Sequence, residues 1–240
     1  MKCLGARNLV KSFKGRRVIN EVSLEVRDKQ VVGLLGPNGA GKTTTFYMIV
    51  GLVRPDSGSV YLNDVDITDI PMYERARKGI GYLAQEPSVF RKLTVRENIR
   101  AVLEFQEITD KERDRKVDRL MEELGISHLA DMRAYTLSGG ERRRVEIARC
   151  LALDPSFLLL DEPFSGIDPI AVDGLQDIVT GLRKKGMGIL ITDHNVEATL
   201  RICDKAYIID RGSILEEGAP EEILSNQRVR EVYLGERFTL

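Results

Sequence analysis

Residues 36–44 have the types and the spacing of a loop that binds phosphate groups. They are Gly36, Pro37, Asn38, Gly39, Ala40, Gly41, Lys42, Thr43 and Thr44. Glycines let the backbone turn so that its N–H groups face phosphate oxygens at the positive end of a helix. Lys42 adds a positive charge for the β and γ phosphates, and Thr43 offers a hydroxyl to Mg²⁺. We call residues 36–44 the phosphate loop and predict that it binds a nucleoside triphosphate.

The sequence on either side of the phosphate loop supports this prediction. An apolar run at residues 31–35 precedes the loop, and residues 44–52 follow it with helical spacing. A strand, a glycine-rich loop and a helix in that order are the context that the motif requires. A glycine-rich turn that matches by chance is the alternative, and it would not explain these flanking elements.

Two carboxylates, Asp161 and Glu162, directly follow the apolar run at residues 157–160. An open parallel sheet presents such acids at the carboxyl edge of its strands. We expect Asp161 to hold Mg²⁺, and Glu162 to accept a proton from, or orient, an attacking water. The predicted chemistry is phosphoryl transfer to water. The alternative is a pair of solvated acids at a strand end.

Two further polar residues follow predicted strands. Gln85 comes after the strand predicted at residues 80–84 and marks a hinge, and His194 comes after the strand predicted at 189–192. A lone histidine is more often structural than catalytic. A strand end at the same sheet edge as Asp161 and Glu162 favours a functional role for His194.

A second exposed helix start is predicted at residues 137–141, which we call the signature segment. Its polar part is Ser138, Gly139, Gly140 and Glu141. Ser138 and Glu141 have the spacing of a capping box. Each glycine in the first turn lowers helix stability by roughly 1 kcal/mol relative to alanine. Their presence indicates that another group approaches the backbone closely here, and an anion is the natural candidate for that group. A flexible helix start is the alternative.

The order of the elements predicts an α/β fold with additions. Residues 11–26 suggest two short strands joined by a turn at 14–17, and capping boxes begin helices at Thr94 and Thr109. We predict one domain over residues 1–240. Its α/β core with a β subdomain covers about 1–86 and 154–240, and a helical subdomain covers about 87–153.

Composition restricts the class of protein. Lys plus Arg total 36 against 37 for Asp plus Glu, so the chain lacks the positive charge of a nucleic-acid-binding protein. Three arginines at 142–144 point different ways on a helix and do not change this. The three cysteines are widely separated and form no CxxC pair. This pattern argues against a disulfide framework or a zinc site and indicates that the protein works in a reducing cytosol. Nothing approaches eighteen consecutive apolar residues, and we expect neither a membrane span nor a signal peptide.

With these motifs in order, the chain resembles the nucleotide-binding subunits of ATP-binding-cassette transporters over essentially its whole length. The spacing of the phosphate loop, the signature segment and Asp161 is like that of transporter ATPases. Repair and chromosome-maintenance relatives carry long coiled coils in between. The resemblance implies a P-loop NTPase core of the RecA type with an N-terminal antiparallel β subdomain and an inserted α-helical subdomain.

The resemblance also implies roles for single residues. Phe13 would stack on adenine, although a strand-end phenylalanine is more usually part of a core. Gln85 would sense Mg²⁺ and the attacking water. Glu162 would be the catalytic base, and His194 would contact the γ-phosphate. These three residues would be the catalytic ones. The cofactors would be ATP and Mg²⁺, with Thr43, Gln85 and Asp161 around the metal.

The resemblance further implies a homodimer. In this family the helix that starts at Ser138 completes the ATP site of the other subunit, and residues 165–168, with Asp168, cross to that subunit. The working unit would be a head-to-tail dimer with two ATP molecules between the phosphate loops and the signature segments.

Within the family, the chain looks most like the ATPase subunits of lipopolysaccharide-export transporters. The resemblance rests on residues 15–18, 43–48, 79–83, 89–93, 191–196 and 232–238. Cassettes of branched-chain amino-acid importers share several of these segments and are the alternative. The chain departs from the usual pattern at Phe13, where tyrosine is commoner, at Ala84, where proline is usual, and at residues 29–30, where Gly-Glu usually stands.

A transporter ATPase needs membrane partners. We expect two integral-membrane permease subunits to bind a groove near residues 85–100, with Phe90, Arg91 and Leu93 in contact, although Phe90 could equally be buried. The protein would then be cytoplasmic, at the inner face of the inner membrane. A rival class is a soluble ATP-switched scaffold, which usually fuses two cassettes or inserts a coiled coil. A phosphate-binding module without ATPase activity would leave Glu162 and His194 without a task.

Overall fold

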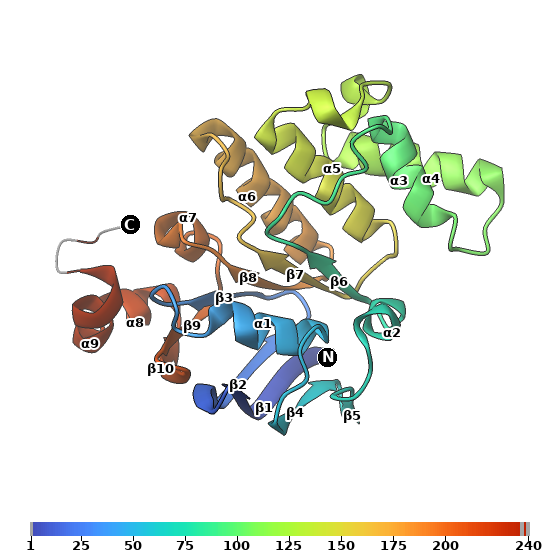
Figure 1. Cartoon of the computed structure of the whole chain (residues 1–240). Coiled ribbons are helices and arrows are strands. Elements are labelled where there is room, and N and C mark those ends of the chain that lie inside the picture. Colours follow the sequence, from blue (N-terminus) through green and yellow to red (C-terminus); the bar gives the residue numbers. More distant parts are fainter. Residues whose placement is uncertain (1, 236–237, 239–240) are drawn as a thin grey trace.

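The structure is a computed structural model that describes residues 2–235 and 238. Its centre is a six-stranded sheet with the strand order β10-β9-β3-β8-β7-β6 (Figure 1). Neighbouring strands from β9 to β6 are parallel, and β10 is antiparallel to β9. The strands are β3 (Val31–Leu35), β6 (Ile80–Leu83), β7 (Phe157–Asp161), β8 (Gly188–Thr192), β9 (Lys205–Asp210) and β10 (Ser213–Gly218). The predicted α/β class is confirmed.

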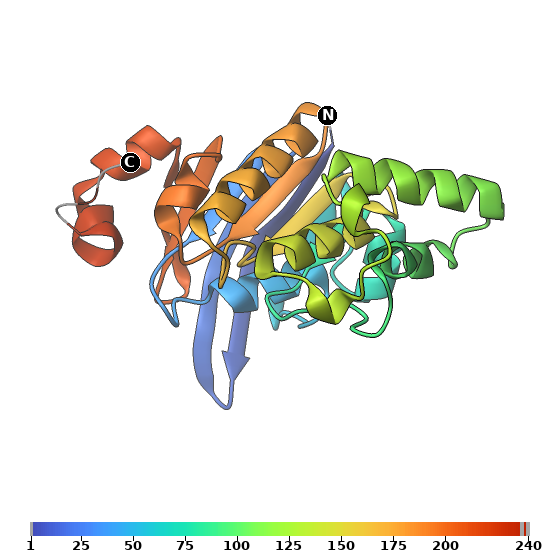
Figure 2. The same cartoon turned by 90° about the horizontal axis from the view of Figure 1, so that it is seen from above.

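A second, antiparallel sheet of four strands lies below the first, in the order β2-β1-β4-β5. Its strands are β1 (Cys3–Phe13), β2 (Arg16–Arg27), β4 (Ser57–Leu62) and β5 (Val65–Asp66). The β1–β2 hairpin projects from the body of the molecule (Figure 2). It is longer than predicted, because β1 begins at Cys3 rather than near residue 11, and Leu4, Ala6 and Leu9 are buried along it.

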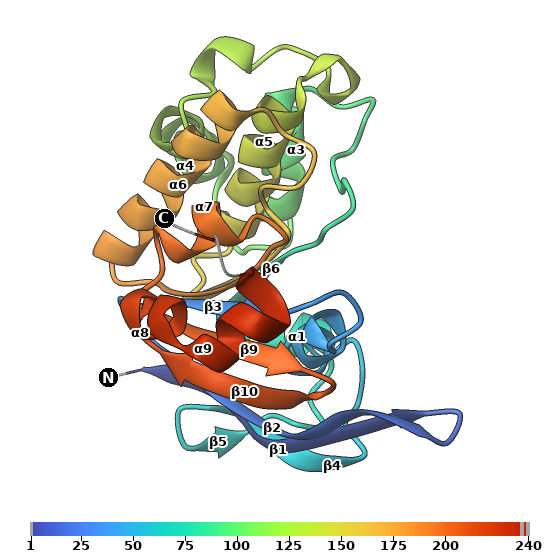
Figure 3. The same cartoon turned by 90° about the vertical axis from the view of Figure 1, so that its left-hand side faces the viewer.

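The helices are distributed over both faces of the large sheet (Figures 1 and 3). Helix α1 lies between the two sheets, and the helices α3 to α6 lie on the opposite face. The helices are α1 (Lys42–Val50), α2 (Met72–Arg77), α3 (Val95–Leu103), α4 (Asp110–Glu123), α5 (Gly139–Leu151), α6 (Pro169–Lys184), α7 (Val196–Leu200), α8 (Pro220–Ser225) and α9 (Gln227–Val229). Short 3₁₀ turns occupy Ser127–Leu129 and Ala134–Thr136.

Alternate residues of the central strands belong to different hydrophobic clusters. Leu158 and Leu160 of β7 pack with the helices α3 to α6, whereas Phe157 and Leu159 pack with α1 and the small sheet. A strand covered on both faces must be apolar throughout, which explains the uninterrupted apolar run before Asp161. The apolar run ends where the helices and the small sheet no longer cover β7, so Asp161 and Glu162 lie at the edge of the large sheet.

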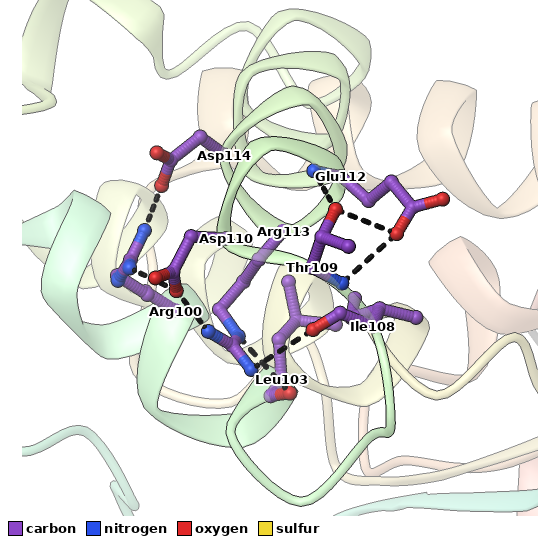
Figure 4. Close-up of polar contacts among 8 residues, drawn as sticks. All are labelled: Arg100, Leu103, Ile108, Thr109, Asp110, Glu112, Arg113 and Asp114. Atoms are coloured by element: carbon purple, nitrogen blue, oxygen red, sulfur yellow. Dashed lines mark hydrogen bonds and ion pairs between the residues drawn. The ribbon is translucent and has the colours of Figure 1, made fainter.

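Each of the three helix starts predicted from capping boxes is confirmed. Thr94, Thr109 and Ser138 are the N-caps of α3, α4 and α5, each with a reciprocal glutamate three residues on. Figure 4 shows the box of α4, in which the Thr109 N–H donates to Glu112 Oε2 at 2.9 Å. Beside it, Arg100 of α3 forms ion pairs with Asp110 and Asp114 of α4.

The C-terminal helices form a small separate cluster beside the central sheet (Figure 3). Ile223 of α8 and Val229 of α9 pack with Leu35, Leu200 and Ile208. A π-helical turn at Arg230–Leu234 follows α9. Within residues 2–235 and 238, no helix has both the length and the apolar content to cross a membrane.

Candidate active site

The phosphate loop connects β3 to α1. Gly36 has φ 152° and Gly41 has φ 111°, and both lie against other elements. A Cβ on Gly36 would lie 2.0 Å from the Ile209 carbonyl oxygen, and one on Gly41 would lie 2.5 Å from Ile19 Cδ1. The loop is therefore held tightly against β9 and β2, and only glycine fits these two positions.

Lys42 is buried in the first turn of α1. Its Nζ donates to the carbonyl oxygens of Gly36 at 2.7 Å and Pro37 at 3.0 Å. Burial lowers the pKa of Lys42, and the nearby charges of Glu162 and Asp161 oppose that shift. The ammonium group is thus positioned at the loop by neutral backbone groups, and among residues 2–235 and 238 it forms no ion pair that an incoming phosphate would have to break.

A pocket opens over the phosphate loop. It is lined by Asn38, Gly39, Gly41, Lys42, Thr43 and Thr44 of the loop and helix α1, by Val18 of β2, and by Glu162 and His194. The strand ends of β7 and β8 therefore face the loop across one pocket, as the sheet-edge argument predicted. Val18 was not anticipated, since an apolar residue in a hairpin strand carries no signal of such a position.

The Glu162 carboxylate is held on both of its oxygens. Gln85 Nε2 donates to Oε2 at 2.7 Å, and His194 Nε2 lies 2.7 Å from Oε1. The Glu162 side chain is only 7% exposed, whereas that of His194 is 51% exposed. These three residues, predicted separately from the ends of three strands, form one cluster. Their catalytic roles remain predictions.

Glu162 also has an unusual backbone conformation. Its φ is 47°, in the left-handed region that residues with side chains seldom adopt. The Glu162 N–H donates to the Thr192 carbonyl at 2.7 Å, which ties this residue to the end of β8. Strained backbone at a site of this kind is consistent with a functional constraint on where the carboxylate points.

Asp161 is fully buried beside Glu162. Tyr82 donates a long hydrogen bond of 3.5 Å to its Oδ2, and its Oδ1 has no hydrogen-bond partner among the residues that the structure describes. Burial, with the neighbouring charge of Glu162, raises the Asp161 pKa to about 6. A buried carboxylate oxygen without a partner is costly, and a cation would satisfy it. The donor set therefore fits Mg²⁺, a hard cation that prefers oxygen ligands.

Asp193 supports the site and was not singled out from the sequence. Its carboxylate accepts the Phe164 N–H and the Asn195 N–H, each at 2.8 Å. It thereby joins the loops that follow β7 and β8. Burial raises the Asp193 pKa, and these backbone hydrogen bonds oppose the shift. A signal was available, because Asp193 directly precedes His194 at a strand end.

Phe13 lies at the end of β1, near the tip of the hairpin. Its side chain is 46% exposed, so it is not a core residue. The Lys11 ammonium lies 5.6 Å from its ring centroid. Phe13 is not among the residues that line the pocket. The predicted contact of Phe13 with adenine stays a prediction.

The signature segment lies away from the pocket, at the N-terminus of α5. A Cβ on Gly139 would lie 3.2 Å from Ile167, and one on Gly140 would lie 2.6 Å from Ala171. The close approach that these glycines indicated is therefore made by the chain's own residues before and within α6. Asp168 caps that helix by accepting the Ala171 N–H at 2.9 Å.

The predicted permease contact lies on the surface after β6. Phe90 is 48% exposed, Arg91 is exposed and Leu93 is half-buried. The alternative in which Phe90 is buried is wrong. The Arg149 guanidinium of α5 lies 4.5 Å from the Phe90 ring centroid, which holds the ring at the surface.

Comparison with known proteins identifies the family. A family model described as "ABC transporter" matches residues 19–165, and one described as "Branched-chain amino acid ATP-binding cassette transporter" matches residues 213–239. The chain is 56% identical to the lipopolysaccharide export system ATP-binding protein LptB of Haemophilus influenzae and 54% identical to LptB of Escherichia coli K12, and each alignment covers 100% of both chains.

Solved structures agree with this assignment. The ADP conformation of an ATP-binding cassette of an ABC transporter superposes with a TM-score of 0.88 at 31% identity, covering 98% of this chain and 100% of that one. The first family model spans more than half of the chain, and it includes the phosphate loop, the signature segment and both acids. The chain therefore belongs to the ABC transporter family, as an ATP-binding cassette that hydrolyses ATP to drive transport.

Proposed function

We propose that the Gln85–Glu162–His194 cluster hydrolyses ATP held on the phosphate loop. The observation that carries this proposal is the Glu162 carboxylate, held by hydrogen-bond distances of 2.7 Å on each oxygen at the edge of the pocket. Glu162 would take the proton of the attacking water, and Gln85 would orient that water. His194, half-exposed at the pocket, would contact the γ-phosphate. Positioning and charge stabilisation are what phosphoryl transfer requires of a protein.

Mg²⁺ completes this proposal. Thr43 would offer its hydroxyl, Asp161 would offer Oδ1 directly or through water, and Gln85 would lie at the edge of the metal's shell. When bound, the ion would neutralise charge on the β and γ phosphates. The buried Asp161 oxygen without a partner among the described residues supports this assignment.

The functional unit that we propose is a head-to-tail homodimer. Within one chain the signature segment lies outside the pocket lining, although Ser138 presents the N-terminus of a helix of thirteen residues. A helix N-terminus favours negative charge, and the γ-phosphate of a second chain's ATP would supply it. Residues 165–168 would lie at the same interface, since Ser165, Gly166 and Asp168 are exposed and Gly166 lies next to Gly139.

The cargo that we propose is lipopolysaccharide, exported from the inner membrane. The full-length identity with the two LptB proteins supports this choice. Two integral-membrane permease subunits would bind through Phe90, Arg91 and Leu93, and would hold the cassette at the cytoplasmic face. Import of branched-chain amino acids is the second candidate, because a model of that group matches residues 213–239.

The test is to isolate the assembled transporter from its native membrane and identify its integral-membrane subunits by mass spectrometry. We expect lipopolysaccharide to co-purify with the complex and to stimulate its ATPase activity. Stimulation by a branched-chain amino acid and its binding protein, without an effect of lipopolysaccharide, would select the second candidate. Recovery of the chain without any membrane subunit would contradict both.

A further inference from the structure

We propose that Arg143 is a positioning residue for ATP hydrolysis, acting on both Gln85 and Glu162 from helix α5. This inference rests on the proposed function, in which Glu162 is the general base. Arg143 is the second of three consecutive arginines, and its side chain is 7% exposed. It lies in the same helix as the signature segment, five residues after Ser138.

The guanidinium of Arg143 binds three consecutive carbonyls at the end of β7. Its Nη2 donates to the Asp161 oxygen at 3.1 Å and the Glu162 oxygen at 2.8 Å, and its Nε donates to the Pro163 oxygen at 3.3 Å. None of these bonds involves the Glu162 side chain. Arg143 therefore fixes the backbone from which the catalytic carboxylate projects and leaves that carboxylate free for chemistry.

The left-handed conformation of Glu162 explains why one side chain can reach all three carbonyls. In an extended strand, successive peptide groups alternate in direction. The φ of 47° at Glu162 breaks that alternation, and the turned carbonyls meet one planar group with five N–H donors. The guanidinium in turn stabilises the turned backbone, so the two features depend on each other.

The same residue holds the segment that carries Gln85. Arg143 Nη1 donates to the Ala84 carbonyl at 2.8 Å and lies 3.1 Å from Glu146 Oε2. Glu146, 2% exposed, accepts the Ser88 N–H on its Oε1 at 2.6 Å. The chain is thus anchored to α5 both before and after Gln85. The buried ion pair neutralises the cation, and its carboxylate provides the second anchor.

These contacts define what Arg143 does. Gln85 and Glu162 share a 2.7 Å hydrogen bond. The backbone beside each of these two residues is bound by the same ion pair, Arg143–Glu146, on helix α5. A shift of α5 relative to β7 would change the position of both residues together. Because α5 begins at the signature segment, ATP bound there by a second chain would bias the geometry of this chain's own catalytic pair.

The test compares Arg143→Lys with Arg144→Lys in the full-length protein. Lysine keeps the charge at 143 but cannot reach four carbonyls in a planar fork. Arg144 is the matched control, because it lies on the same helix and donates to the Leu124 carbonyl at 2.9 Å, away from the pocket. The measurements are kcat and KM for ATP, with the melting temperature recorded in parallel.

We expect Arg143→Lys to lower kcat at least about 10-fold with KM within about 3-fold, since a displacement near 1 Å at a catalytic group can cost about 10²-fold. Arg144→Lys should stay within about 2-fold of the wild type in both constants. A purely structural role would lower the melting temperature of Arg143→Lys but leave kcat per bound nucleotide unchanged, and that outcome would overturn the proposal.

A second variant decides the matter if Arg143→Lys does not fold. Glu146→Gln keeps the shape and an acceptor for the Ser88 N–H but removes the charge, and we expect kcat to fall about 3- to 10-fold. A wild-type kcat in this variant would contradict the proposal.

Glu162→Gln is measured alongside. Full turnover by Glu162→Gln would refute the base assignment, whereas its inactivity beside a fully active Glu146→Gln would refute the role of Arg143 alone.

Discussion

Gln85 donates a 2.7 Å hydrogen bond to Glu162 although 77 residues separate them in the chain. Gln85 begins the segment that leads to the exposed Phe90 and Arg91, and Glu162 lies at the pocket over the phosphate loop. The bond therefore joins the proposed permease contact to the proposed base. An event at either place has a direct physical route to the other.

The first prediction concerns the base. Glu162→Gln removes the proton acceptor but keeps a side chain of the same size, so we expect hydrolysis to fall by about 10²–10⁴-fold while ATP still binds. Phosphate release and nucleotide binding are measured on the same preparation. Glu221→Gln, on the exposed start of α8, is the control and should behave as the wild type. Wild-type hydrolysis by Glu162→Gln would exclude this assignment.

The second prediction concerns Asp161 and pH. Its pKa is raised from 3.8 to about 6, so the folded state holds this proton more tightly than the unfolded state does. Without metal, the stability that this proton provides is present below about pH 4 and is lost as the pH rises through 6. Asp193, whose pKa is also raised, contributes in the same direction.

Mg²⁺ with nucleotide should reverse that trend, because the ion binds the ionised carboxylate. We expect the increase in melting temperature on adding Mg²⁺ and ATP to grow between pH 5 and 7 in the wild type. Asp161→Asn should lose this growth, whereas Asp64→Asn, at an exposed turn, should keep it. An identical pH dependence in Asp161→Asn would show that another group binds the ion.

The third prediction concerns the dimer. Ser138→Arg places a long cationic side chain at the N-terminus of α5, where a phosphate of the second chain's nucleotide would lie. In the Glu162→Gln background, ATP should produce a dimer that sedimentation velocity detects, and the added Ser138→Arg should prevent it. The control is Ser127→Arg on an exposed 3₁₀ turn, which should dimerise normally. Dimerisation of the Ser138→Arg protein would remove the signature segment from the interface.

The fourth prediction concerns the membrane subunits. Arg91→Glu reverses an exposed charge next to Phe90 and should prevent co-purification with the permeases, while the isolated cassette keeps its hydrolysis rate within about 2-fold. Arg115→Glu, on the exposed face of α4, serves as the matched control. Normal assembly and transport with Arg91→Glu would mean that the permeases bind elsewhere.

Local features made much of the fold predictable. The capping boxes at Thr94, Thr109 and Ser138 each need only four consecutive residues, and all three begin helices. The apolar run before Asp161 identified a strand covered on both faces. Strand ends in a parallel sheet meet at one edge, so the approach of Glu162 and His194 to the phosphate loop followed from order alone.

Features that depend on tertiary packing escaped prediction. Arg143 reads as one of three surface arginines, yet it is the buried one, on the same side of α5 as Ile147 and Leu151. A charged residue at an apolar helix position, with Glu146 three residues on, was the available signal. Similarly, Gly139 and Gly140 indicated close approach correctly, but sequence cannot tell which group approaches, and here it includes Ile167 and Ala171.

At Glu162, the left-handed backbone lowers the stability of the fold, whereas the side chain that this backbone carries is needed for the proposed catalysis. This conformation costs a residue with a Cβ roughly 1–2 kcal/mol, and glycine would avoid most of that cost. Glycine at position 162 would relieve this backbone cost, but the protein would lose its proposed base and both 2.7 Å contacts of the carboxylate in the same step. An engineer seeking a more durable cassette should therefore look for stabilising changes elsewhere and leave this strained residue in place.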